Sequence, residues 1–87
     1  MGLFEEWYKL ELGSGLTQAE ILRNINEACG TRYKSNWIAQ QQNNVQGLAR
    51  TPYPVRRYMT EKVLKDRLAK YGITDGRAIH HILNAIL

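Results

Sequence analysis

The sequence predicts an all-α fold, a compact domain of five helices formed by a single chain of 87 residues. Apolar residues recur three and four positions apart in several segments, which is the spacing of one helix face. Helix-start and helix-stop signals flank these segments. No segment sustains the apolar–polar alternation that would predict a strand. At this length one domain is expected, over residues 1–87.

Two helices are expected in the first third of the chain. The first covers residues 3–12, where large apolar residues share one face, and a Gly-Ser-Gly segment ends it. The second begins at Thr17, because the Thr17 hydroxyl can accept the N–H three residues on while Glu20 reaches back, as in a capping box. Gly30 is expected to close this helix in the left-handed conformation.

The third helix is expected over about residues 32–44, with Thr31 as its N-cap. Trp37 and Ile38 would anchor it to the core, and they lead into a run of amides in the stretch WIAQQQNN. On a helical wheel at about 100° per residue, Gln41 points to the apolar side and most other amides point away from it. The stretch therefore predicts one buried face and one exposed, amide-rich face.

A loop is expected over residues 45–54, and Pro54 suits the first turn of a fourth helix that runs to about Lys70. This helix carries two apolar groups on nearly opposite sides, so it is either buried broadly or broken near Thr60. A fifth helix is expected within residues 74–87, which carry the strongest amphipathic stripe of the chain.

The exposed face of the third helix has side chains suited to reading DNA bases. Asn and Gln can pair with N6 and N7 of adenine, Arg can pair with O6 and N7 of guanine, and a methyl group can touch the thymine methyl. The candidate base-reading residues are Arg32, Ser35, Asn36, Ala39, Gln40 and Asn43.

Charge is distributed unevenly along the chain, whose net charge is +4. Residues 1–30 carry five acids and two bases, whereas residues 31–57 carry five bases and no acid. A long stretch without carboxylates favours contact with a polyanion, although a solvated basic surface is the simpler alternative. The candidate phosphate-binding residues close to the third helix are Lys34, Arg50, Arg56 and Arg57.

The segment GLTQAEI and the short helix after it resemble the helix-turn-helix of the lambda-repressor-like (Cro/CI, XRE) family. Leu16-Thr17-Gln18 matches the start of that motif, Gly30 its turn, and Ala49-Arg50-Thr51-Pro52 the end of the loop that follows. The segment before the turn is longer than the usual form by about one helical turn. The Glu-Asn-Gly that is common after the recognition helix is absent.

The resemblance implies a transcriptional regulator, a repressor, that inserts the third helix into the major groove of double-stranded DNA as a homodimer. It also implies that Gln18 contacts a DNA phosphate and that the half-sites lie about one DNA turn apart, roughly 34 Å. Regulators of this kind are common on phages and plasmids. The expected location is therefore the bacterial cytoplasm or nucleoid.

The C-terminal amphipathic stripe has two interpretations. It can pack into the domain core, or it can form the seam of a homodimer through Ile79, Ile82, Leu83 and Ile86. A second class of function also stays open: a small helical protein-interaction module, such as an adaptor, an antitoxin or a phage host-takeover protein, whose amide-rich face meets another protein. Salt dependence separates the two functions, because DNA binding weakens steeply with salt.

The remaining residues argue against an enzyme, a metal site and a cofactor. Cys29 is the only cysteine, so an internal disulfide and a Cys-based zinc site are excluded, and a half-buried place near a helix end is expected. His80 and His81 point about 100° apart on a helix and cannot chelate one ion together. No catalytic constellation, signal peptide, membrane span or small-molecule site is visible in the sequence.

Overall fold

The computed structural model describes residues 2–43 and 51–87 of the chain. In these two ranges the regular structure consists of five helices, and no strand occurs. The helices are α1 (Leu3–Gly13), α2 (Gln18–Cys29), α3 (Ser35–Asn43), α4 (Tyr53–Ala69) and α5 (Gly76–Ile86). The predicted all-α fold of five helices is therefore confirmed.

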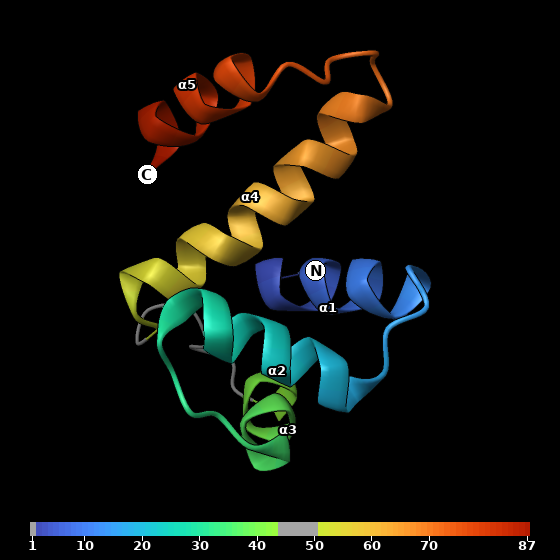
Figure 1. Ribbon diagram of the computed structural model, residues 1–87, viewed down its shortest axis with the longest axis vertical. Coiled ribbons are helices and arrows are strands. Elements are labelled where there is room, and N and C mark those ends of the chain that lie inside the picture. The colour runs from blue at the N-terminus through green and yellow to red at the C-terminus, as the bar shows by residue number, and fades with distance from the viewer. Residues whose placement is uncertain (1, 44–50) are drawn as a thin grey trace.

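The long helix α4 is the element around which the others are arranged, and α1, α2 and α5 each pack against it (Figure 1). It continues without a break through Thr60, whose hydroxyl donates a hydrogen bond to the Arg56 carbonyl oxygen at 2.8 Å. The predicted break near Thr60 is therefore absent. The group of Val55, Met59 and Val63 is buried, but in the other group Leu64 and Leu68 are half-buried, and Tyr71 lies beyond the helix end and is 83% exposed.

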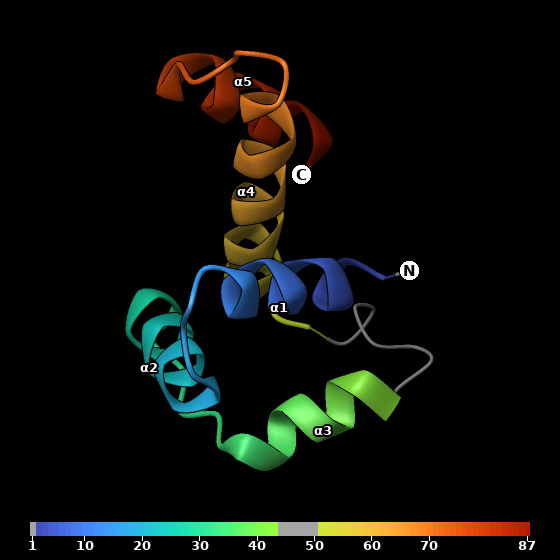
Figure 2. The ribbon, with the colours of Figure 1, turned by 90° about the vertical axis from the view of Figure 1, so that its right-hand side faces the viewer.

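The helices α3 and α5 lie at opposite ends of the molecule (Figures 1 and 2). The longest extent of the molecule is 35 Å, and α4 links the end that holds α5 to the middle of the domain, where α1 and α2 lie. At the other end α3 packs against α1 and α2. The amide-rich helix and the C-terminal stripe therefore belong to two separate surfaces.

The main core is formed jointly by α1, α2, α3 and α4. The Trp37 ring meets the Phe4 ring edge-on at 5.6 Å between centroids, and Tyr33 stacks on Trp37 at 4.3 Å. Such aromatic pairs add to the stabilisation that burial of their apolar surface provides. The buried members of this core are Phe4, Trp7, Ile21, Leu22, Ile25, Trp37, Ile38, Val55, Met59 and Val63.

The predicted start and end of α2 are confirmed. The Thr17 N–H donates to the Glu20 carboxylate at 3.0 Å, and the Glu20 N–H donates to the Thr17 hydroxyl oxygen at 3.2 Å. Gly30 ends the helix with a φ of 67°, a left-handed conformation that glycine adopts without a steric penalty. The residues that predicted the two ends of α2, which are Thr17 with Glu20 at the start and Gly30 at the end, therefore form those ends.

The C-terminal helix α5 begins after Asp75, whose carboxylate accepts the Arg77 N–H at 3.0 Å. Two of the four proposed dimer residues, Ile79 and Leu83, are buried within the single chain. The assignment of these two to a dimer seam is wrong, because their side chains are already covered in the monomer, where α5 packs on α4. The other two differ: Ile82 is half-buried, and Ile86 is 59% exposed.

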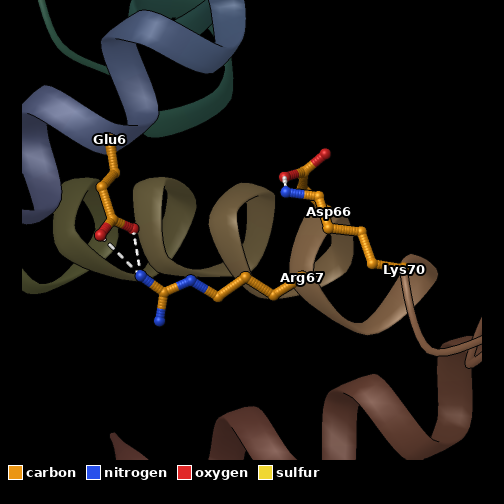
Figure 3. Close-up of polar contacts among 4 residues, drawn as sticks. All are labelled: Glu6, Asp66, Arg67 and Lys70. Carbon is orange, nitrogen blue, oxygen red and sulfur yellow. Dashed lines mark hydrogen bonds and ion pairs between the residues drawn. The ribbon is translucent and has the colours of Figure 1, made fainter.

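One of the surface ion pairs of the described residues links α1 to the second half of α4 (Figure 3). The Nη2 atom of Arg67 on α4 donates to the two carboxylate oxygens of Glu6 on α1, at distances of 2.6 and 2.5 Å. Along α4 itself Lys70 pairs with Asp66 at 3.5 Å.

None of the helices in residues 2–43 and 51–87 combines the length and the apolar character that crossing a membrane requires.

Candidate nucleic-acid interface

The connection between α2 and α3 differs from its prediction. The helix α3 begins at Ser35 and not near residue 32, and Thr31 is not its N-cap. The Thr31 hydroxyl instead donates to the Asn26 side-chain oxygen at 2.8 Å. The predicted start was wrong because hydrogen bonds to Asn26 hold residues 31–33 in a non-helical segment before the helix.

Asn26, on the last turn of α2, fixes this connection through both ends of its side-chain amide. Its Nδ2 donates to the Tyr33 carbonyl oxygen at 2.9 Å, and its Oδ1 accepts the Tyr33 N–H at 2.9 Å. Its backbone oxygen also accepts the Thr31 N–H at 3.1 Å. Nothing in the sequence distinguishes Asn26 from Asn24 two positions earlier, so the role of Asn26 could not be predicted from the sequence.

The two faces predicted for α3 are confirmed. Trp37 and Ile38 are buried, as the helical wheel predicted, and Gln41 is half-buried. Asn36, Ala39, Gln40, Gln41 and Asn43 line one open depression of the surface. The exposed candidates on α3, called the amide face from here on, are Ser35, Asn36, Ala39, Gln40 and Asn43.

Gln42 is exposed but does not belong to the amide face. It lines a shallow groove between α3 and α1, together with the apolar residues Phe4, Tyr8 and Leu12 of α1. The groove also borders one carboxylate and one ammonium group of α1, those of Glu5 and Lys9. The amides of the run 40–44 that the structure describes therefore do not form one surface, and Gln42 offers a matched control for the others.

Two basic residues precede α3 on the connection from α2. Arg32 and Lys34 are both exposed, and neither takes part in the ion pairs formed within the described part of the chain. The helical wheel placed Arg32 on α3, and this placement is wrong because the helix starts later. Both cations nevertheless lie at the N-terminal end of the amide face, and they have no carboxylate partner there.

The other candidate phosphate contacts are arranged differently. Gln18 is exposed at the first position of α2. Arg57 donates to the Asn84 side-chain oxygen of α5 at 2.9 Å and to the Tyr53 hydroxyl at 3.2 Å. The guanidinium of Arg56 lies 5.9 Å from the centre of the Tyr53 ring. Because both arginines have contacts within the domain, we exclude them from the proposed interface; Arg50 lies outside the described residues.

Cys29 is half-buried at the end of α2, as predicted. Its thiol lies 3.6 Å from the Pro54 carbonyl oxygen of α4, and burial raises the pKa of the Cys29 thiol above its usual value. A thiol of raised pKa stays neutral and is a poor nucleophile and metal ligand. Within residues 2–43 and 51–87 no group of three His, Cys, Asp or Glu side chains is placed to hold a metal ion.

Comparison with protein-family models, curated proteins and solved structures gave no match to this chain. The resemblance to lambda-repressor-like regulators therefore stays a prediction from the sequence motif.

Proposed function

We propose that this protein is a sequence-specific regulator, a repressor, that binds double-stranded DNA with α3 in the major groove. The observation that carries the proposal is the amide face of α3. It presents uncharged hydrogen-bonding groups and one methyl group to solvent. The buried side chains of Trp37 and Ile38 fix the same helix to the core. Side-chain amides have the directional donors and acceptors that discriminate base edges.

Charge supports the same orientation. Phosphates surround the major groove, so cations beside a base-reading helix favour binding and an excess of carboxylates there weakens it. Arg32 and Lys34 are exposed at one end of α3, and the sequence from Ala28 to Thr60 contains no acid. In the proposed complex Lys34 and Gln18 contact phosphates, while Arg32 contacts a base at the edge of the site.

We further propose that two copies bind together, since a small domain gains affinity when a second copy occupies an adjacent half-site. Of the four residues first considered for the dimer seam, Ile82 and Ile86 are the two that are not fully covered within one chain. A dimer of this kind has a two-fold axis, so its DNA site is a palindrome.

Selection of bound duplexes from random DNA tests this proposal, and the expected result is an enriched palindromic sequence. Affinity for that sequence should fall with a log–log salt slope of about −0.9 per neutralised phosphate. Lys34→Gln should weaken binding to every sequence and reduce the magnitude of the slope by about 0.9 for each bound copy, about 1.8 for the proposed dimer.

The control for this substitution is Lys65→Gln, because Lys65 pairs with Glu61 on α4 at 3.3 Å and lies outside the proposed interface. This variant should keep the wild-type affinity and slope. A chain that binds no duplex, or binds without dependence on salt, would contradict the proposal and favour the protein-interaction module.

A further inference from the structure

We infer that the base pairs read by α3 are A·T pairs, with Asn36, Gln40 and Asn43 pairing with adenines and Ala39 touching a thymine methyl. This inference deepens the proposed function and rests on it. It names the sequence class of the DNA, which major-groove binding alone does not determine.

The composition of α3 excludes the usual side chains for G·C pairs. Guanine is read through O6 and N7 by Arg or Lys, and the N4 amine of cytosine is read by Asp or Glu. Residues 35–43 contain none of these four residue types. The exposed groups that remain on the helix are amides, one serine hydroxyl and one methyl, and amides are the partners of adenine.

The positions of the amides match the spacing of stacked bases. Asn36, Gln40 and Asn43 lie within about 60° of one another around the helix, since each residue turns it by about 100°. Along the axis they span about 10 Å at about 1.5 Å per residue. This length equals about three steps of stacked base pairs at about 3.4 Å each.

Ala39 complements these amides, because it lies on the same exposed face. An A·T pair presents a thymine methyl next to the adenine donor and acceptor in the major groove. A small apolar side chain between amides can touch that methyl without blocking the neighbouring amides. The face therefore offers partners for both bases of the pair.

The environment of the face favours DNA over another occupant. Arg32 and Lys34 are exposed beside it, and the sequence between Ala28 and Thr60 holds no carboxylate that would repel phosphates. The edge of α3 that faces α1 is different, because Gln42 shares its groove with apolar side chains and with the opposite charges of Glu5 and Lys9. The inferred contact thus uses one defined face of α3.

Base analogues in the selected duplex test the inference. Replacing one contacted adenine by 7-deaza-adenine removes N7, one of the two atoms that an amide contacts, and should weaken binding by roughly 5- to 150-fold because the amide donor is left without an acceptor. Replacing adenine by 2,6-diaminopurine changes only the minor groove and should leave affinity unchanged. Replacing A·T by inosine·C keeps an A·T-like minor groove but presents O6, and it should weaken binding as G·C does.

Variants then assign the contacts. Asn36→Ala and Gln40→Ala should each become insensitive to 7-deaza-adenine at one position of the site, and each position should differ. Gln42→Ala is the matched control, with the same chemistry on the same helix outside the amide face, and it should retain every sensitivity.

The inference is overturned if the selected site lacks an A·T core or if the analogues have no effect. It is also overturned if diaminopurine weakens binding while inosine is tolerated, because that pattern indicates reading from the minor groove. With a site of another composition or with inert analogues, a steep salt slope would leave the proposed function intact, whereas minor-groove reading would also contradict the insertion of α3 into the major groove. Failure to bind any duplex would reject both.

Discussion

Asn26 is the residue on which the position of the proposed DNA-contacting segment depends. Its side chain makes hydrogen bonds to the Thr31 hydroxyl and to both backbone polar groups of Tyr33. A side-chain amide that satisfies an N–H and a C=O replaces the backbone partners that a helix would have supplied. The exposed Arg32 is held between these two bonded residues, so its place relative to α3 follows from Asn26.

We predict that Asn26→Ala lowers the free energy of unfolding by about 1–3 kcal/mol, because it leaves partly buried backbone groups of Tyr33 without a partner. Urea denaturation measures this change. Asn24→Ala is the control, since it gains the same helix propensity on the same helix. The prediction fails if the two variants are equally stable.

At this scale the sequence predicts burial better than hydrogen bonding. Trp37 and Ile38 are placed correctly by the helical wheel, because burial follows the period of the helix. The prediction of Thr31 as an N-cap was wrong because threonine is common both at N-caps and in turns. The residue that holds Thr31 in the turn, Asn26, belongs to another helix. A contact between elements has no local signal in the sequence.

Helix boundaries are predictable where the capping residues are local, as they are in α2. The capping box is contained in four consecutive residues, TQAE, and both of its hydrogen bonds form. The hydrogen bond from the Thr17 N–H, with a second contribution from the Thr17 side chain, lowers the pKa of the Glu20 carboxyl below its ordinary value of 4.5. The ionised form is therefore favoured in the folded chain.

Thr17→Ala should destabilise the domain by about 1 kcal/mol, as expected for loss of an N-cap acceptor. Thermal unfolding followed by circular dichroism measures this as a fall in the midpoint of about 4–8 °C. An unchanged midpoint would show that the cap makes no contribution.

The same capping box predicts a dependence on pH. Since the pKa of Glu20 is lower in the folded state, its contribution is present above pH 4.5 and is lost as the pH falls through the folded pKa. Glu20→Gln keeps a capping oxygen but does not titrate. The stability of the wild type relative to this variant should therefore decrease below pH 4.5, and a constant difference would contradict the assignment.

The whole molecule shows what the pattern of a single helix cannot determine. The stripe on α5 predicted an apolar contact, and periodicity alone did not distinguish contact with α4 from contact with a second copy. The structure divides the stripe: Ile79 and Leu83 are covered by the chain itself, and Ile86 is not. The partner of an amphipathic face depends on chain topology, which connects α4 and α5 through residues 70–75.

This division predicts unequal costs for substitutions along one stripe. Leu83→Ala should lower the free energy of unfolding by about 2–5 kcal/mol, because it leaves a cavity at a fully buried site. Ile86→Ala should change it by no more than about 0.5 kcal/mol, as is usual for exposed positions. Urea denaturation at a protein concentration low enough to keep the chain monomeric compares the two, and equal costs would refute the division.

The separation of α3 from α5 has a consequence for how a proposed dimer would recognise its site. If copies join near Ile86, the dimer contact lies at one end of each chain and α3 contacts DNA at the other. The helix α4, with 17 residues, spans about 25 Å of the distance between them. The identity of the bases would then be read by α3, while the distance between half-sites would be set by the dimer contact near Ile86. Substitutions in α3 would thus change the base sequence that is recognised, and substitutions near Ile86 would change the spacing of the half-sites.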